Sequence, residues 1–312
     1  MSIRIVTDSN SGITQELGEK IGVKVIPMPF FIDGEEYLEG VNLNQKEFFN
    51  KLANGSNVST SQPSIGLLMD TWDDILKNDD YIIYIPMSSG LSKSYESAYM
   101  LANSDEYKGK VFVVNNKRIS IPQEESVYEA LEMVNKGLNP DVIAKTLEDE
   151  GLNHDIFIML DTLEYLKKGG RITPAAAALG GFLKLKPVLK IKGDKLDSYK
   201  MRNRSLDGAK DIIKDACRKS IIDYLNEDSD SEFRFEVAYS GIDDTEALKL
   251  ANDIKLEFGV SDVKIKQLSL SISCHTGPNA LGMAICKKIK IDEIKNSVFI
   301  DERLDTLKEI NI

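Results

Sequence analysis

Short apolar runs alternate with amphipathic segments through the first half of the chain. Apolar runs at residues 3–6, 81–85 and 111–114 predict buried strands, and residues 23–32 form a further extended run that Pro27 and Pro29 favour at a sheet edge. Helical spacing of apolar residues marks the intervening segments 17–21, 45–53, 65–76, 124–136 and 140–150, with a further helix that begins at residue 92 or 94. This alternation predicts a parallel sheet with helices on both faces.

The pattern changes after residue 151. Strands are expected at residues 156–160, 188–191, 195–200, 233–239, 263–268 and 283–286, and helices at 162–168, 175–185, 206–225 and 245–258. Residues 274–282 are interpreted as a tight turn into the last strand. Because several of these strands are joined by hairpins, they predict a mixed or antiparallel sheet.

The two patterns together predict a two-domain α/β protein. Residues 1–155 are expected to form a parallel-sheet α/β/α domain, and residues 156–312 an α+β domain with a mixed or antiparallel sheet. Residues 288–312 are interpreted as a packing or dimerisation helix without chemistry of its own.

Composition places the chain among ordinary globular proteins. It has 312 residues, of which 42% are hydrophobic and 29% charged, and no apolar stretch approaches a membrane span or a signal peptide. We therefore expect a cytoplasmic protein. The three cysteines lack paired spacing, so we expect small core residues rather than a disulfide framework or a zinc site.

Charge is distributed unevenly along the chain. The net charge of −11 argues against general nucleic-acid binding, which needs clustered Lys and Arg. Residues 167–204 nevertheless hold eleven Lys or Arg against Asp194 and Asp197, a local charge of +9. Such a stripe suits an acidic protein partner, a phosphate group or an anionic membrane surface, although a solvated helix and hairpin face would look the same.

A hydroxyl-rich loop follows the central apolar run. Ser88, Ser89 and Ser92 lie between a predicted strand and a predicted helix, where free backbone N–H groups and the helix dipole favour an anion. The alternative is that these serines only cap the helix and shape the turn. Thr60 and Ser61 offer further hydroxyls on irregular backbone, and Asp8 and Ser9 follow another strand.

Four motifs in this order and spacing resemble the DegV family of bacterial fatty-acid-binding proteins. They are TSQPS at residues 60–64, SSGLS at 88–92, LKKGGRI at 166–172 and HTGP at 275–278 with the following Leu281-Gly282. The resemblance covers about residues 3–287 and includes the opening Thr7-Asp8-Ser9. Family members include the lipid-carrying subunit of fatty acid kinase, in which two domains clasp one long-chain fatty acid.

The resemblance implies a carrier without catalytic residues, metal or cofactor. A separate ATP-binding kinase subunit would phosphorylate the carboxyl group of the bound lipid and so supply an acyl phosphate for phospholipid synthesis. Any membrane contact would be transient.

Site residues follow from the same resemblance, position by position. Thr60 and Ser92 match hydroxyls that bond the fatty-acid carboxylate, Ser61 and Ser89 are neighbours, and His275 completes the polar network. Arg171 matches a basic residue near the pocket entrance implicated in the kinase encounter. Arg202 and Arg204 fall in a similar basic hairpin.

A simple energy estimate assigns different roles to the acyl tail and the carboxylate head group of a bound fatty acid. At roughly 0.8 kcal/mol per buried methylene, about fourteen methylenes contribute on the order of 11 kcal/mol before the costs of binding. A buried carboxylate loses several kcal/mol unless its oxygens accept hydrogen bonds, which hydroxyl and imidazole donors can supply. The tail should therefore supply affinity, and the head group should fix the register.

The chain departs from the family pattern at four places. Lys93 and Asn279 stand where members usually carry Gly, Lys184 lies near a usual Asn, and residues 120–125 replace a Gly-rich helix start with SIPQEE. If that segment lines the tail cavity, Glu124 or Glu125 could shorten the cavity or point to a different ligand.

Two other functions fit parts of the pattern. Ser92 as nucleophile and His275 as base would suit an acyl hydrolase or transferase, although the sequence contains no G-x-S-x-G motif and no identifiable residue to orient His275. The other alternative is a regulatory or interaction protein with a vestigial pocket. For His275 taken alone, a structural histidine is the commoner outcome.

Overall fold

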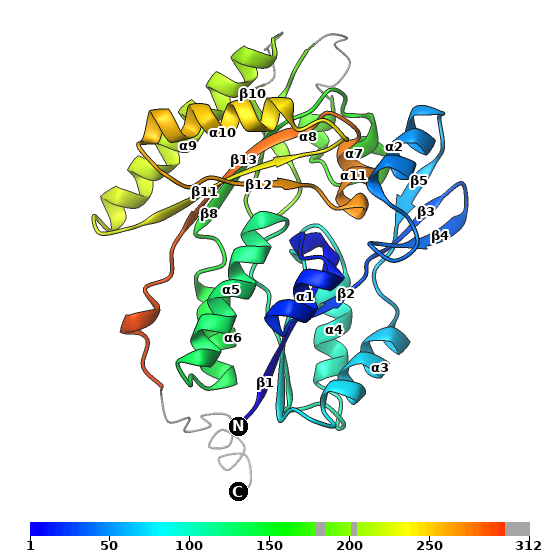
Figure 1. The fold of residues 1–312 in the computed structure, drawn as a ribbon, viewed down its shortest axis with the longest axis vertical. Coiled ribbons are helices and arrows are strands. Elements are labelled where there is room, and N and C mark those ends of the chain that lie inside the picture. The colour runs from blue at the N-terminus through cyan, green and yellow to red at the C-terminus, as the bar shows by residue number, and fades with distance from the viewer. Residues whose placement is uncertain (179–184, 201–204, 297–312) are drawn as a thin grey trace, which may run out of the picture.

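Four parallel strands form the sheet of the N-terminal half, in the order β2-β1-β6-β7. The computed structural model describes residues 1–178, 185–200 and 205–296, and Figure 1 places this sheet in its lower half. The strands are β1 (Ile3–Asp8), β2 (Lys24–Ile26), β6 (Tyr81–Ile85) and β7 (Val111–Val113). All three pairings are parallel, which confirms the predicted sheet.

Helices cover both faces of this sheet. One face carries α1 (Gln15–Ile21), α5 (Ile121–Asn135) and α6 (Pro140–Asp149), and the other carries α3 (Ile65–Ile75) and α4 (Ser94–Ala102). Because side chains alternate along a strand, Ile5 packs into the first layer and Val6 into the second. The N-terminal half is therefore a three-layer α/β/α structure.

A second, antiparallel sheet of three strands was not predicted. It consists of β3 (Pro29–Ile32), β4 (Glu35–Leu38) and β5 (Val58–Thr60) in the order β4-β3-β5, with α2 (Gln45–Ala53) beside it. The expected single run at residues 23–32 thus divides between two sheets, with Pro29 as the first residue of β3. Phe30 of this sheet packs against Leu270 and Cys274 of the C-terminal half.

The sheet of the C-terminal half has six strands in the order β10-β9-β8-β13-β11-β12. They are β8 (His154–Met159), β9 (Val188–Ile191), β10 (Asp197–Lys200), β11 (Phe233–Tyr239), β12 (Lys264–Gln267) and β13 (Leu281–Lys287). Only the β11–β12 pairing is parallel among the described strands of this sheet. The predicted mixed sheet is confirmed.

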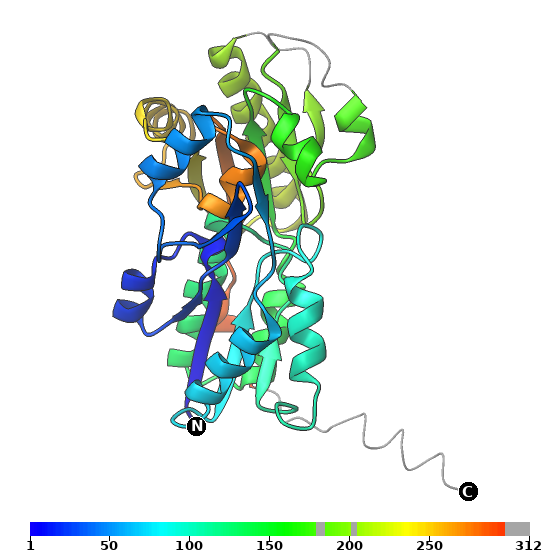
Figure 2. The same cartoon turned by 90° about the vertical axis from the view of Figure 1, so that its right-hand side faces the viewer.

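The two faces of the six-stranded sheet have different neighbours. Helices α9 (Leu206–Glu227) and α10 (Thr245–Phe258) cover the outer face. The inner face meets α7 (Glu164–Gly169), α8 (Pro174–Ala178) and residues of the N-terminal half such as Met87 and Ile119. The halves are stacked along the long axis of the molecule in both views (Figures 1 and 2).

Two predicted elements differ from the structure near the site. Residues 274–276 belong to a helix, α11 (Leu270–Thr276), and residues 281–282 belong to β13, so the interpretation of residues 274–282 as a tight turn was wrong for its first three and last two residues. Ser269 caps this helix, because its hydroxyl oxygen accepts a hydrogen bond from the Ile272 N–H. This N-cap serine was a local signal for the start of the helix. The helix expected at residues 175–185 is described only as α8, and residues 179–184 lie outside the described part.

The last described residues return to the N-terminal half (Figure 1). Ile291 joins the core of α5 and α6, and the backbone N–H of Asn139 donates to Asn296 Oδ1 at 2.9 Å. Among residues 288–296 the expected helix is reduced to one 3-10 turn, Ile291–Glu293. Residues 297–312 lie outside the described part. The expectation that the three cysteines are core residues is confirmed, since Cys217, Cys274 and Cys286 are all buried.

Candidate functional site

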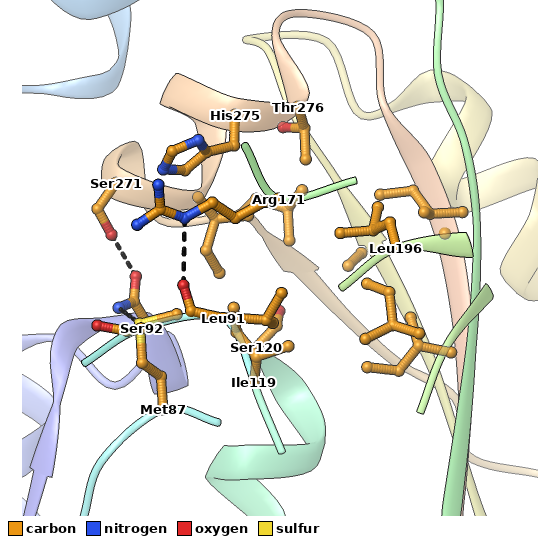
Figure 3. Close-up of a pocket in the computed structure, with 18 of the residues that line it drawn as sticks. Met87, Leu91, Ser92, Ile119, Ser120, Arg171, Leu196, Ser271, His275 and Thr276 are labelled. Carbon is orange, nitrogen blue, oxygen red and sulfur yellow. Dashed lines mark hydrogen bonds between the residues drawn. The ribbon is translucent and has the colours of Figure 1, made fainter. Parts of the chain in front are cut away.

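A cavity of about 270 Å³ lies between the inner face of the six-stranded sheet and loops of the N-terminal half. Its floor consists of apolar sheet residues such as Ile156, Ile158 and Ile191. Polar side chains gather at one end, where Figure 3 places His275, Arg171 and Ser92 close together, while Leu196 lies among apolar side chains on the right. An apolar cavity with a few convergent polar groups is typical of a small-molecule site.

Thr60 and His275 meet at the polar end. Thr60 Oγ1 lies 2.9 Å from His275 Nε2, within hydrogen-bond distance. Thr60 ends β5 of the small sheet, and α11 packs on that sheet through Leu270 and Cys274. The unpredicted sheet therefore brings the two residues together.

His275 is a neutral, tightly packed imidazole. Burial and the nearby Arg171 guanidinium lower its pKa from 6.5 to about 4. Its Nδ1 atom is buried without a hydrogen-bond partner among the described residues. A Cβ atom on Gly169 would lie 2.0 Å from this nitrogen, so the close packing of α7 and α11 requires glycine there.

A buried carboxylate holds the other end of α11. Glu39 accepts hydrogen bonds from the backbone N–H groups of Leu270 at 2.7 Å and Ser271 at 2.9 Å. Burial raises the pKa of Glu39 to about 7, although the two hydrogen bonds by themselves lower this pKa. The first turn of the helix that carries His275 is thereby anchored to the small sheet's loop.

The serine loop is fixed by its own contacts. Asp8 Oδ2 accepts from the Met87 N–H at 2.8 Å, and Ser88 Oγ donates to the Gly193 carbonyl at 2.8 Å. Ser92 Oγ lies 2.8 Å from Ser94 Oγ and lines the cavity. Burial raises the pKa of Asp8 to about 6. Ser88 therefore joins the two halves, while Ser92 remains at the cavity wall.

Ser61 lines the cavity next to Thr60, but Ser89 does not. The Ser89 hydroxyl instead accepts a hydrogen bond from Lys117 Nζ at 3.1 Å. The sequence predicted four hydroxyls as ligand contacts. The structure brings three of them, on Thr60, Ser61 and Ser92, to one cavity, and Ser89 is not part of the cavity lining.

Arg171 lies in the cavity lining itself. Its Nε donates to the Leu91 carbonyl at 3.1 Å (Figure 3), and Nη1 donates to the Gly169 carbonyl. The guanidinium thus joins the C-terminal half to the serine loop and stands beside the neutral donors. Arg202 and Arg204 lie outside the described residues.

Seven further polar residues line the cavity, although the sequence analysis did not single them out as ligand contacts. They are Asn10, Gln62, Lys93, Ser120, Glu236, Ser271 and Thr276. The side-chain oxygen Oδ1 of Asn10 accepts hydrogen bonds from the hydroxyls of Ser269, at 3.1 Å, and of Ser271. The turn that follows the first strand was a usable signal for Asn10, because it lies at the same sheet edge as the serine loop.

Glu124 and Glu125 are not among the residues that line the cavity. Glu124 pairs with Lys264 at 3.5 Å and with Lys266, and Glu125 pairs with Arg234 at 2.9 Å. The preceding residues Ser120, Ile121 and Pro122 line the cavity instead. These two glutamates therefore join α5 to the six-stranded sheet and do not shorten the cavity.

The geometry does not support the hydrolase interpretation. Ser92 pairs with Ser94 and His275 with Thr60, and no described acidic residue bonds the imidazole Nδ1. A nucleophile, a base and an orienting residue are therefore not assembled here.

Neither a metal-binding cluster nor a membrane-spanning helix occurs among the described residues. No group of three or more His, Cys, Asp or Glu there could hold a metal ion. In the same ranges, none of the helices combines the length and apolarity needed to cross a membrane.

Comparisons with known proteins agree over nearly the whole chain. A family profile described as "Uncharacterised protein, DegV family" matches residues 2–288. A DegV domain-containing protein of Staphylococcus aureus is 31% identical over 291 residues, which cover 91% of this chain and 98% of that protein.

The solved structures of DegV family proteins are also similar to this chain. A DegV family protein from Thermus thermophilus, described with fatty-acid binding, has a TM-score of 0.82 at 30% identity and covers 92% of this chain and 100% of its own. DegV from Bacillus subtilis, described as a fatty acid binding protein, has a TM-score of 0.76 at 27% identity, with the same coverage of both chains.

Proposed function

The chain belongs to the DegV family, and from that premise we propose that it binds one long-chain fatty acid in the cavity between its two halves. The contact between Thr60 and His275, with an apolar cavity behind it, is the observation that carries this proposal. The fatty-acid binding described for the Thermus and Bacillus proteins supports it. Residues 1–155 and 156–312 would act as the two clasping domains.

The carboxylate belongs at the polar end. Thr60 and Ser92 supply neutral hydroxyl donors there, His275 orients the Thr60 hydroxyl through the contact at Nε2, and Arg171 supplies a cation. Hydrogen bonds to an ionised acceptor contribute roughly 1.5–3 kcal/mol each, which offsets the desolvation of a buried carboxylate. The acyl chain then extends over Ile156, Ile158 and the other apolar floor residues.

The protein would be a carrier and not an enzyme. The bound lipid would be presented to an ATP-binding kinase subunit in the cytoplasm, and that subunit would form the acyl phosphate for phospholipid synthesis. Basic residues around the polar end support such an encounter, because Lys167 and Lys168 are exposed on α7 next to Arg171. Arg202 and Arg204 would extend the same basic surface.

Calorimetric titration of delipidated protein with palmitic acid and with hexadecanol tests the binding proposal. We expect the acid to bind at least tenfold more tightly than the alcohol, because only the acid presents an ionised acceptor to the polar end. Equal affinities, or no binding of either compound, would contradict the proposal.

Phosphate transfer with purified kinase subunit tests the carrier role separately. Arg171→Ala should lower the rate of acyl phosphate formation more than it lowers palmitic acid affinity. Equal loss of both would place Arg171 at the lipid head group only. No transfer with wild-type protein that carries bound lipid would refute the presentation role and leave lipid binding intact.

A further inference from the structure

Glu236 is an acidic residue on the floor of an otherwise apolar part of the cavity. It belongs to β11, where Glu236 pairs with Ala284 of β13, and Ala284 pairs in turn with Ile156 of β8. These three residues form one row across the sheet, and all three line the cavity. Glu236 thus occupies a position in a row whose other two members, Ala284 and Ile156, have apolar side chains.

The row that contains Glu236 lies away from the polar end. β13 begins at Leu281, just after the helix that carries His275, so Gly282 is the first floor residue of this strand and Ala284 the next on the same face. Two residues along a strand correspond to roughly 7 Å. Glu236 therefore meets the tail of a lipid and not its carboxylate.

The following row closes the cavity. Arg234 pairs with Cys286 in the sheet, and neither residue lines the cavity. Arg234 instead forms ion pairs with Glu125 and Glu129, both at 2.9 Å. Glu236 is consequently the last floor residue of β11 before the ionic contacts between α5 and the sheet.

One oxygen of Glu236 has a partner and the other has none. The residue is 1% exposed, and Cys286 Sγ donates to Oε2 at 3.8 Å. Oε1 is buried without a hydrogen-bond partner among the described residues. Burial, followed by the charge of Glu125, raises the pKa of Glu236 well above its usual range, which favours the protonated carboxyl. It can therefore both donate and accept a hydrogen bond.

We propose that Glu236 determines ligand specificity, and that the cavity takes a fatty acid with a hydroxyl or oxo group on its tail, which pairs with the free oxygen of Glu236. This inference rests on the proposed fatty-acid binding and narrows its ligand class. A plain hydrocarbon tail would leave Oε1 unpaired in the closed cavity, whereas an oxygen at the matching carbon would satisfy it. Sites built to bond a ligand hydroxyl reject the analogue that lacks it.

Titration of delipidated protein with stearic acid and a panel of hydroxystearic acids tests the inference. The panel carries the hydroxyl at successive carbons from the middle of the chain to the methyl end. We expect one positional isomer to bind the wild-type protein about tenfold more tightly than stearic acid, as one satisfied buried hydrogen bond implies. Glu236→Leu should abolish that preference without weakening stearic acid binding.

Glu236→Gln serves as the matched variant. Its amide also donates and accepts, so it should keep the preference, and it keeps the test decisive if the leucine variant fails to fold. The inference is overturned if wild-type protein binds stearic acid at least as tightly as every isomer, or if Glu236→Leu leaves the preference unchanged. Binding of stearic acid without any preference defeats this inference alone, whereas binding of no lipid defeats the proposed function as well.

Discussion

Thr60 Oγ1 lies 2.9 Å from His275 Nε2, although 215 residues separate the two in the chain. The contact exists because the small sheet that ends at Thr60 packs on the helix that carries His275, with Phe30, Leu270 and Cys274 in one cluster. The two residues therefore depend on packing between the halves, and the polar end of the cavity forms only when the halves are together.

Loss of the Thr60 hydroxyl should weaken fatty-acid binding. Thr60→Val keeps the shape of the side chain and removes one donor to the carboxylate, so we expect palmitic acid to bind about tenfold more weakly in a calorimetric titration. Ser59→Ala is the matched control, because Ser59 precedes Thr60 on the same strand and its side chain is exposed. Equal affinities of the Thr60 variant and the control would refute the assigned contact.

A methyl group on Gly169 should displace the His275 ring. The added Cβ would lie 2.0 Å from Nδ1, and overpacking of this kind costs about 1–3 kcal/mol. We expect Gly169→Ala to lower both the free energy of unfolding and the affinity for palmitic acid. In Gly66→Ala the nearest atom lies 4.0 Å from the new Cβ, so this helical control should be neutral or stabilising. A Gly169 variant as stable as the control would show that the helices can separate.

Removal of the buried Arg118–Glu129 ion pair should lower the stability of the protein more than removal of an exposed ion pair. Arg118 Nη1 lies 3.2 Å from Glu129 Oε2, and both side chains are 1% exposed. Arg118→Met leaves the buried Glu129 carboxylate without the positive charge of Arg118. We therefore expect the free energy of unfolding, measured by chemical denaturation, to fall by about 3–5 kcal/mol. Lys145→Met, which removes an exposed pair with Asp149, should cost less than about 1 kcal/mol. Comparable losses in the two variants would contradict this assignment.

Acid should destabilise the ligand-free protein partly through His275. The folded-state pKa is about 4, below the unfolded value of 6.5, so between these pH values the unfolded chain binds a proton that the folded protein does not. Stability is therefore lost as the pH falls through this window, on the order of 3 kcal/mol for this group. Relative to wild type, His275→Gln should gain stability from neutral pH down to about 4.

Denaturation of both proteins at several pH values measures that difference. Asp8 and Glu39 carry raised pKa values of about 6 and about 7, which act in the opposite direction, but both are present in wild type and variant alike. The comparison therefore isolates His275. If the two proteins respond identically to acid, His275 is not held neutral in the folded state.

Local patterns predicted the two main sheets but not the small one. Alternating strands and helices were sufficient for the parallel sheet, and hairpin spacing was sufficient for the mixed one. The small sheet contains β5, which is only three residues long, and its stability comes from contacts with α11 that are distant in sequence. Periodicity over three residues carries too little information to predict such a strand.

Local sequence patterns also fail to predict the surroundings of some single residues. The alternation in FRFEVAY at residues 233–239 is typical of a strand with one solvated face, yet Glu236 is buried against the cavity. Only the position of the N-terminal half over this sheet determines that burial. By contrast, Asn279 stands where the resemblance leads us to expect glycine and has a φ of 58°, a backbone conformation that asparagine tolerates better than most residues.

The lipid carried by the purified protein tests the central claim most directly. Mass spectrometry of an organic extract from wild-type protein, purified without added lipid, should find a long-chain fatty acid at close to one molecule per chain. Ala284→Phe should fill the cavity floor and yield little or none, while its thermal unfolding confirms a folded protein. Repeated absence of fatty acid from wild-type protein, or equal amounts from both proteins, would contradict the account.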